Sequence, residues 1–420
     1  MKLAIIGGGS TYSPELVEGL IQRGEKIGLT ELVLMDIDEK RLDIVGSFAE
    51  RMVKHAGAPF KVWRTTDRTR AIDGASFVLT QIRVGQQPAR HKDIMLGLRH
   101  GLIGQETTGV GGFAKAMRTI PAMMDIVRDI ERTAPEAWII NFTNPSGLIT
   151  EAMHRFGAKR LVGLCNIPIG MVMDLSLYLG VGPDHIKIDY VGLNHLSWVR
   201  KVELDGQDIA PRVIEALAGA EGPVMIPEMD YGPDFVRALG YIPSPYLRYF
   251  YATEKMLAEL QAAPKSRAEE VMEIEQILLA KYADPSVVTK PAELEKRGGA
   301  FYSKIAVDLI DAIWSDKGET HIVNVPNKGM VKGIGDDQVV EIASVIRRDG
   351  AHPLPVGEVD PKILGLMQQV KAYETLAAEA GLEGSYRKAF QALVAHPLCP
   401  ASKAKAVLDD IIATHGLELR

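Results

Sequence analysis

The sequence predicts an α/β protein whose first part is a Rossmann-like, doubly wound parallel sheet. Short β-branched runs alternate with helical patterns through the first 165 residues, which is the order expected for a parallel sheet with crossover helices. A glycine-rich turn directly follows the first of these runs. At about 150 residues per domain, 420 residues leave room for a second domain.

Six strands are predicted in the first part of the chain, a number that suits the dinucleotide-binding fold. Between them, the helical pattern is clearest over 117–130, where apolar residues recur every three or four positions and Pro121 can kink or restart the helix. The strands are expected at 3–6, 32–36, 61–64, 77–81, 138–142 and 161–164.

The pattern changes from about residue 170 onward. Strands are predicted at 189–193 and 197–204, and Asp205-Gly206 is a hairpin-turn sequence. The remainder is expected to be mostly helical, including 361–376, which Asp360 can cap. We therefore expect two domains, residues 1–168 and residues 169–420, the second of mixed α+β and mainly helical character.

The segment 222–245 is rich in proline, glycine and tyrosine. Long irregular segments of this kind often act as lids or binding loops. A passive surface loop fits the composition equally well.

The composition favours a small-molecule partner. A net charge of −6, from 48 basic and 54 acidic residues, leaves no extended basic face, which argues against nucleic acid or an anionic membrane as partner. The first residues contain no signal-peptide core, and no run of about 18 apolar residues follows. Two cysteines cannot build a disulfide framework. We therefore expect a cytoplasmic protein.

The turn Gly7-Gly8-Gly9-Ser10-Thr11-Tyr12 matches part of the dinucleotide fingerprint. Gly7 and Gly9 allow a tight turn and close approach to a pyrophosphate at the helix N-terminus. Tyr12 stands where the fingerprint has its third glycine, so a bare glycine turn is the alternative. Asp36 ends the second strand, where a carboxylate can bind the adenosine ribose and repel a 2′-phosphate, which favours NAD over NADP. Helix capping by Asp36 or Asp38 is the competing interpretation.

Cys165 ends the sixth predicted strand, and that end of a parallel sheet faces the ligand crevice. Together with His195 it would form an incomplete metal site, which lacks about two ligands that water or substrate would supply. A lone cysteine beside leucines is more often buried packing, the role assigned to Cys399, and His195 can likewise be a core histidine.

Eight segments together resemble glycoside hydrolase family 4, the NAD- and divalent-metal-dependent phospho-glycosidases, and especially its 6-phospho-β-glucosidases. They follow the family's order from the first strand to about residue 350. They are Ile6–Ser10, Gln81–Gly85, Gly104–Gly109, Asn141–Gly147, Cys165–Pro168, Leu193–His195, Tyr246–Tyr249 and Arg267–Met272.

The resemblance implies a fold like that of lactate and malate dehydrogenases, a homodimer or homotetramer, and manganese as the usual metal. It makes residues 1–168 the NAD-binding domain and residues 169–420 the domain for substrate, metal and oligomerisation. It also implies a cycle in which NAD⁺ oxidises the sugar at C3, the C2 proton is removed and the C1 substituent is eliminated. Water then adds, and the hydride returns, so NAD is not consumed.

The resemblance also assigns residues. Tyr246 would be the base at C2, although a phenol with a pKa of about 10 needs the metal or Arg267 to favour phenolate, and three further tyrosines lie nearby in the sequence. Arg90 would bind the sugar phosphate, assisted by Arg83. The remaining assignments are Cys165 and His195 to the metal, Gly7, Gly9, Ser10, Thr11, Asp36 and Asn144 to the cofactor, and Glu106, Asn144, Asn166 and Arg267 to the substrate.

Family members that act on α-linked substrates often carry an acid directly after the metal cysteine. Here that residue is Asn166, which cannot donate a proton as a carboxylic acid does. The resemblance therefore points to the β-selective branch, with a phospho-α-glycosidase as the alternative.

Two other functions remain open at this point. A 2-hydroxy-acid dehydrogenase would share the fold, but no Asp-x-x-Arg with a Gly-Glu-His-Gly loop is present. A non-catalytic NAD sensor would not need Cys165, His195 and Tyr246 together.

Overall fold

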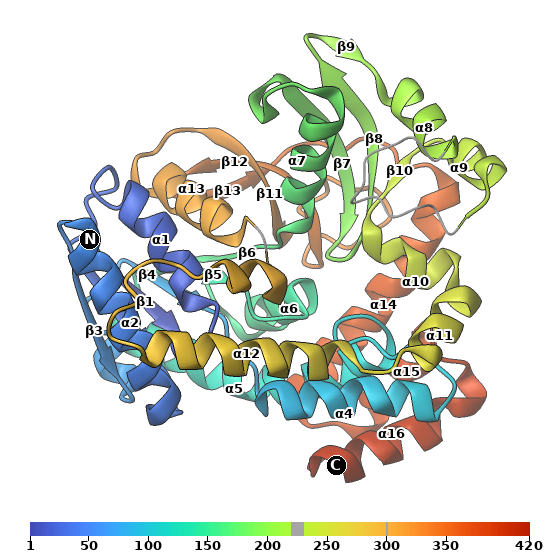
Figure 1. The fold of residues 1–420 in the computed structure, drawn as a ribbon. Helices are drawn as coiled ribbons and strands as arrows, with labels where there is room; N and C mark the ends of the chain where they lie inside the picture. The colour runs from blue at the N-terminus through green and yellow to red at the C-terminus, as the bar shows by residue number, and fades with distance from the viewer. Residues whose placement is uncertain (220–230, 300) are drawn as a thin grey trace.

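The computed structural model describes residues 1–219, 231–299 and 301–420. A nine-stranded sheet forms its centre (Figure 1). The strands are β1 (Lys2–Ile6), β2 (Glu31–Met35), β3 (Lys61–Thr65), β4 (Phe77–Thr80), β5 (Trp138–Asn141), β6 (Leu161–Gly163), β11 (Glu319–Pro326), β12 (Val339–Arg347) and β13 (Gly350–Pro353).

Strands β1 to β6 are parallel and lie in the order β3-β2-β1-β4-β5-β6. This is the strand order of the dinucleotide-binding fold, and each of the six predicted strands overlaps one of them. The predicted fold class is confirmed. Asp36 and Gln81 fall just beyond their strands and begin the loops at the carboxyl edge.

Strands β11, β12 and β13 were not predicted, although the remainder is mainly helical as expected. They extend the sheet antiparallel beyond β6, where Asn324 pairs with Gly163. The chain thus returns to the first sheet after more than 150 intervening residues.

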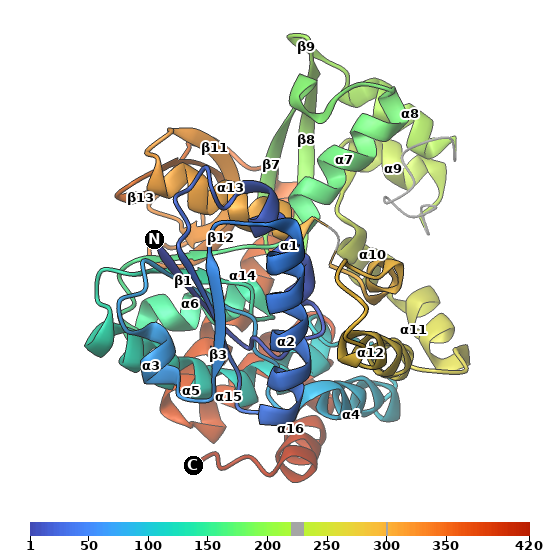
Figure 2. The same cartoon turned by 60° about the vertical axis from the view of Figure 1, so that its left-hand side comes forward.

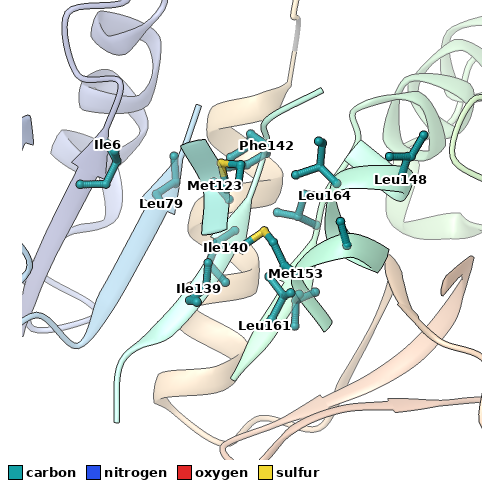
Figure 3. Packing of buried hydrophobic residues seen from close by; sticks show 14 of the residues in the cluster. Ile6, Leu79, Met123, Ile139, Ile140, Phe142, Leu148, Met153, Leu161 and Leu164 are labelled. Carbon is teal, nitrogen blue, oxygen red and sulfur yellow. The ribbon is translucent and has the colours of Figure 1, made fainter. Parts of the chain in front are cut away.

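Helices cover both faces of the sheet (Figure 2), which is why its parallel strands are apolar almost throughout. Figure 3 shows Leu79 and Ile140 from the strands packed with Met123 and Met153 from the helices. One group of mutually packed helices comprises α1 (Ser13–Arg23), α2 (Glu39–Ala56) and α13 (Tyr302–Trp314), and another comprises α3 (Arg68–Ile72), α5 (Gly109–Thr133), α6 (Ser146–Phe156) and α14 (Pro361–Glu383).

Two predicted helices are longer than expected. Helix α5 runs without interruption through Pro121, so the proline does not restart it. Helix α14 begins at Pro361, and the carboxylate of Asp360 accepts a hydrogen bond from the Lys362 N–H at 3.0 Å, as predicted for a cap.

A smaller sheet with its own apolar core stands above the large one in Figure 1. The predicted strands and the Asp205-Gly206 turn, which leads into β9, are confirmed. Of the predicted loop 222–245, residues 222–230 lie outside the described residues. The sheet contains β7 (Ile186–Leu193), β8 (Leu196–Leu204), β9 (Gln207–Asp208) and β10 (Ile242–Pro243), and its helices are α7 (Ile167–Leu179), α8 (Ala210–Ala218) and α9 (Pro233–Leu239).

Helices α12 (Arg267–Ala283) and α4 (Gln86–Arg99) lie in the lower part of the molecule in Figure 1. Helix α12 packs on α2 and on α4 and so lies against the first sheet's layer. In the part of the chain that the structure describes, every helix is too short or too polar to cross a membrane. The others are α10 (Arg248–Tyr251), α11 (Thr253–Ala262), α15 (Tyr386–Ala395), α16 (Ala401–His415) and the 3₁₀ turns η1 (Pro183–His185), η2 (Pro245–Leu247) and η3 (Ala292–Arg297).

Candidate active site

A cavity of about 820 Å³ lies at the carboxyl edge of the parallel strands. In open parallel sheets, ligands bind at this edge. The cavity is lined by residues that follow five different strands, namely Gly7, Asp36, Gln81, Asn144 and Asn166.

The glycine turn packs tightly against the neighbouring strands. Gly7 has a φ of +94°, and a Cβ at this position would lie 2.9 Å from the carbonyl oxygen of Gln81. The Gly9 N–H donates to Asp36 Oδ2 at 2.9 Å, which ties the end of β1 to the end of β2. The turn therefore leaves its backbone open to the cavity and requires glycine.

Asp36 and Asp38 have different roles at this edge. The N-cap of α2 is Asp38, whose carboxylate accepts from the Arg41 N–H at 3.1 Å. The second oxygen of Asp36 accepts from the Asp38 N–H at 3.0 Å. Asp36 thus lines the cavity with both oxygens fixed in place, as a ribose-binding carboxylate requires.

Thr11 lies buried beneath the glycine turn, and of the predicted cofactor residues it alone does not border the cavity as described. Its hydroxyl donates to Glu275 Oε1 at 3.2 Å and accepts from Arg297 Nε at 2.7 Å. Tyr12, at the third fingerprint position, lines the cavity and meets the ring of Tyr302 edge-on, with 5.9 Å between ring centroids.

Cys165, His195 and Tyr246 come together from the end of β6, the β7–β8 turn and η2. The rings of His195 and Tyr246 are stacked with their centroids 3.8 Å apart and line the cavity. The Cys165 thiol is buried, accepts from the Ile167 N–H at 3.5 Å, and is near enough to raise the pKa of Tyr246. Three residues predicted to act together are therefore neighbours.

His195 is held in the neutral form that binds metal ions. It occupies the tight β7–β8 turn with a φ of +64°, and its Nδ1 lies 3.1 Å from Thr107 Oγ1. Burial, reinforced by Lys115, lowers the pKa of His195 to about 3.

The turn that carries His195 is anchored from behind by Asn194. Its Oδ1 accepts from the Gly147 N–H at 3.3 Å, and its Nδ2 donates to Glu341 Oε1 at 3.1 Å. These bonds join the turn to α6 and β12, so elements from both halves of the chain position the imidazole.

A soft thiol beside a neutral imidazole fits a divalent transition metal. Among the described residues, no cluster contains three or more of the His, Cys, Asp and Glu side chains that could hold an ion, so further ligands must be substrate oxygens or water. Burial and Glu341 raise the pKa of the Cys165 thiol. A bound cation would favour its thiolate instead.

A buried cluster of charges surrounds Glu106. Its Oε1 lies 2.9 Å from Arg90 Nη2 and its Oε2 lies 3.0 Å from Lys115 Nζ, while Arg83 forms a third ion pair. Although burial opposes ionisation, the cations Arg83, Lys115 and Arg90 hold the pKa of Glu106 well below its usual range. Burial, together with Arg83, lowers the pKa of Lys115 to about 7. Two arginines and Lys115 around one carboxylate make this end of the cavity suitable for an anionic ligand.

The other predicted substrate residues border the same cavity. Asn144 Oδ1 is buried without a hydrogen-bond partner among the described residues, so it can receive a bond from a ligand. Asn166 is the N-cap residue of α7. Arg267 begins α12 and bonds to Glu270 at 2.8 Å and to the Lys296 carbonyl at 2.9 Å. Of the two groups predicted to favour the Tyr246 phenolate, the metal or Arg267, Arg267 is thus engaged elsewhere.

Sequence reasoning missed Lys115, Thr107, Glu275 and Arg297, all of which contact predicted site residues. The sequence could have marked Lys115 as a candidate site residue, because it is the one charged residue in the otherwise apolar run from Gly109 to Met117. Glu275 and Arg297 had none, since both lie in ordinary charged segments far along the chain.

The doubly wound sheet and the cavity at its carboxyl edge define a protein of the dinucleotide-binding fold class. Residues 2–181 match the family described as Family 4 glycosyl hydrolase, and residues 190–399 match the Family 4 glycosyl hydrolase C-terminal domain. The chain belongs to family 4 of the glycosyl hydrolases.

Individual relatives agree with this assignment. The chain is 43% identical over 425 residues to a probable 6-phospho-beta-glucosidase of Bacillus subtilis (strain 168), covering 99% of this chain and 96% of that protein. It is 38% identical to the 6-phospho-beta glucosidase of Thermotoga maritima solved with manganese, NAD⁺ and glucose-6-phosphate, with a TM-score of 0.93 over 100% and 99% of the two chains.

A more distant structure bears on the fold alone. The malate dehydrogenase of Cryptosporidium parvum is 13% identical, covers 91% of this chain and 99% of its own, and has a TM-score of 0.56. The predicted likeness to the malate dehydrogenase fold is therefore confirmed.

Proposed function

We propose that the protein hydrolyses 6-phospho-β-glucosides with the help of NAD and a divalent metal ion, with manganese as the expected ion. One observation carries the proposal: a single cavity joins the glycine turn, the stacked pair His195–Tyr246 and the cationic cluster around Glu106. A dinucleotide, a sugar ring and a phosphate would occupy these three parts. The relatives named 6-phospho-beta-glucosidase support the same reaction.

The bound groups would supply redox and Lewis-acid chemistry: NAD⁺ exchanges a hydride with sugar C3 and the metal polarises the C3 oxygen, which acidifies the C2 proton. Cys165 and His195 would hold the metal. Asp36 would hold the adenosine ribose, and Gly7, Gly9 and Ser10 would let the cofactor approach the turn.

Tyr246 would accept the C2 proton on its phenolic oxygen. Burial raises its pKa, and Tyr249, Cys165 and Glu106 raise it further, whereas a hydrogen bond with Thr107 lowers it. The phenol is therefore protonated before the metal arrives, and a cation at Cys165 and His195 would favour the phenolate that the reaction needs.

Arg90 would bind the 6-phosphate, together with Arg83 and Lys115. A guanidinium can grip a phosphate through two parallel hydrogen bonds. Arg90 Nε is buried and has no partner among the described residues, so it has a donor to give. A phosphate dianion would also balance the excess positive charge around Glu106. The ring hydroxyls would be bound by Asn144, Asn166 and Arg267.

Cofactor dependence is the direct test of this function. Protein stripped of NAD and treated with a chelator should not hydrolyse 4-nitrophenyl 6-phospho-β-glucoside, and activity should return only when NAD⁺ and Mn²⁺ are added together. Full activity without either would contradict the proposal. Steady accumulation of NADH at 340 nm would instead indicate a dehydrogenase.

Phosphate recognition can be tested at Arg90. Arg90→Ala should raise the KM for the phosphorylated substrate about tenfold or more, since a hydrogen bond to a charged group is worth about 1.5 to 3 kcal/mol. The non-phosphorylated glucoside should be a poor substrate for both proteins. If wild type cleaves both glucosides equally well, the cationic cluster does not bind the phosphate.

The preferred anomer follows from Asn166. This residue has no proton of suitable acidity to give to a leaving oxygen on the α face. We therefore expect kcat/KM to favour the β over the α form of 4-nitrophenyl 6-phosphoglucoside. A preference for the α form would assign the chain to the phospho-α-glycosidase branch.

We also propose a cytoplasmic homodimer or homotetramer. Both cysteines are free thiols, as a reducing compartment would keep them. Light scattering on the purified full chain measures the assembly directly, and a monomer at all concentrations would contradict the proposal.

A further inference from the structure

Two guanidinium groups and one carboxylate lie beside the glycine turn, in the same cavity. Arg297, the last residue of η3, donates from Nη2 to Glu275 Oε1 at 3.2 Å and to Ser10 Oγ at 3.5 Å. Arg41 donates from Nη2 to Glu275 Oε2 at 3.1 Å and from Nε to the Gly9 carbonyl at 3.5 Å. Their side chains are only 16% and 21% exposed, and that of Glu275 is 8% exposed.

In this group, two guanidinium groups share one ion-pair partner. Glu275 is the ion-pair partner of both arginines, and the nearby Asp36 carboxylate is engaged by the N–H groups of Gly9 and Asp38. An uncompensated guanidinium in a mostly buried place is costly unless an anion joins it. A pair of guanidinium groups with one shared carboxylate therefore suits an anionic ligand next to the turn.

The turn has fewer features that can bind a pyrophosphate than the full dinucleotide fingerprint has. Its third glycine is replaced by Tyr12, and the hydroxyl of Thr11 is already bonded to Glu275 and Arg297. The guanidinium of Arg297 also lies over the Tyr12 ring, 5.6 Å from its centroid. Arg297 thus lies beside three consecutive residues of the turn, Ser10, Thr11 and Tyr12.

We infer that Arg297 binds the diphosphate of the dinucleotide, with Arg41 beside it and Glu275 as a positioning residue that fixes both guanidinium groups. The inference rests on the proposed NAD dependence and adds to it a charged ligand supplied from far along the chain. The same phosphate chemistry could come from the sugar phosphate, but Arg297 hydrogen-bonds to the turn residues Ser10 and Thr11, whereas Arg90 pairs with Glu106.

The test measures binding rather than turnover. Dissociation constants are determined by calorimetry for NADH, ADP, adenosine and glucose 6-phosphate with the full chain and with Arg297→Gln. We expect the variant to bind NADH and ADP about tenfold to a hundredfold more weakly, as for a lost hydrogen bond to a charged group. Affinity for adenosine and for glucose 6-phosphate should stay within about twofold, because neither ligand carries a diphosphate.

Arg267→Gln is the matched control, since Arg267 lines the same cavity but bonds to Glu270 and Lys296. It should leave ADP binding unchanged. Arg297→Lys keeps the positive charge but loses the paired N–H donors of the guanidinium. Its affinity for ADP should therefore lie between those of wild type and Arg297→Gln. That variant also carries the test if Arg297→Gln does not fold.

The outcomes separate the possibilities. Wild type that binds no NADH would overturn the proposed cofactor itself. Wild type that binds NADH while both Arg297 variants bind ADP equally well would overturn this inference alone. Loss of glucose 6-phosphate binding with ADP binding retained would assign Arg297 to the substrate phosphate. A parallel loss of all four ligands would make it a structural residue.

Discussion

At the scale of single residues, the two cysteines of this chain can be compared directly, because they are equally buried but lie in different places. Both thiols are 3% exposed. Cys165 lies beside the cavity-lining pair His195–Tyr246, whereas Cys399 lies in the turn before α16, is packed in the main hydrophobic core, and donates from its thiol to the Pro400 carbonyl at 3.9 Å. Burial alone cannot distinguish them, but location does.

We expect Cys165→Ser to weaken Mn²⁺ binding and to reduce hydrolysis, because a hard hydroxyl replaces a polarisable thiolate. Cys399→Ser should change neither. Metal affinity is measured by calorimetry and activity on 4-nitrophenyl 6-phospho-β-glucoside. An equal loss in the two variants would show that Cys165 serves only the packing.

Tyr246→Phe should lower kcat at least about 10²-fold, the smaller effect expected for a positioned acid or base. NAD binding and the thermal midpoint should stay near those of wild type, because the ring keeps its stacking on His195. Tyr249→Phe is the matched control, since its ring lies 6.0 Å from that of Tyr246 and is not among the cavity-lining residues as described.

Isotope exchange checks the proton transfer independently of the residue. Product formed by wild type in D₂O should carry deuterium at C2. Unlabelled product would contradict removal of the C2 proton by any base.

The sequence predicted most of the candidate site but little of what holds it together. Gly9, Asp36, Cys165 and His195 could be found because motif and strand position mark them. Glu275 could not, since its contacts with Thr11, Arg41 and Arg297 join positions more than 200 residues apart or lie in segments without a motif.

At the scale of elements, a buried network joins α6, β12 and α14. Lys371 Nζ donates to Glu151 Oε2 at 2.8 Å and to Glu374 Oε2 at 2.5 Å, and Glu151 also accepts from the Val339 N–H at 3.1 Å. Lys371 is 1% exposed and Glu151 is fully buried. The ammonium is therefore the shared ion-pair partner of two carboxylates inside the protein.

Lys371→Met should lower the free energy of unfolding by about 3 to 5 kcal/mol, the usual cost of leaving a buried charge without its partner. Urea unfolding at pH 7 measures this. The control Lys405→Met removes an exposed i,i+4 pair with Asp409 and should cost less than about 1 kcal/mol. Equal stability of the two variants would show that Glu151 and Glu374 do not need Lys371.

The strands that could be predicted from the sequence differ from those that could not in how far along the chain their neighbouring strands lie. Strands β1 to β6 follow one another with their crossover helices, so local periodicity was enough. Strand β12 has an apolar, β-branched sequence, Val339-Val340-Glu341-Ile342-Ala343, but its partners were unknown. Glu341 on this strand binds Asn194 and Asn324 inside the protein, a role that its charge does not suggest.

At the scale of the whole molecule, buried histidines make stability depend on pH. Burial and Lys328 lower the pKa of His154 to about 4, and burial lowers that of His396 to about 3. Each stays neutral in the folded protein while the unfolded chain takes up a proton near pH 6.5. The contribution of these histidines to the free energy of unfolding is therefore fully present above pH 6.5. It decreases as the pH falls toward their pKa values in the folded protein.

The free energy of unfolding of wild type should fall from pH 7.5 to pH 5.0, and in His154→Gln this fall should be smaller by about 2 kcal/mol. The reason is that the unfolded variant has no imidazole at position 154 to take up a proton. Urea unfolding at the two pH values gives this difference. The exposed His55, changed to Gln, is the control and should keep the wild-type dependence. A His154→Gln protein as acid-sensitive as wild type would show that this imidazole is not responsible.

The return of β11 to the edge of β6 has a consequence for how the protein is made. While the chain is still on the ribosome, β6 has no neighbour on that side until residues 319–326 emerge, roughly 8 to 30 s later at ordinary elongation rates. An uncovered strand edge with apolar faces invites pairing with other nascent chains. We therefore expect the half-made polypeptide to depend on chaperones until its last third is synthesised, whereas the finished protein hides that edge within its own sheet.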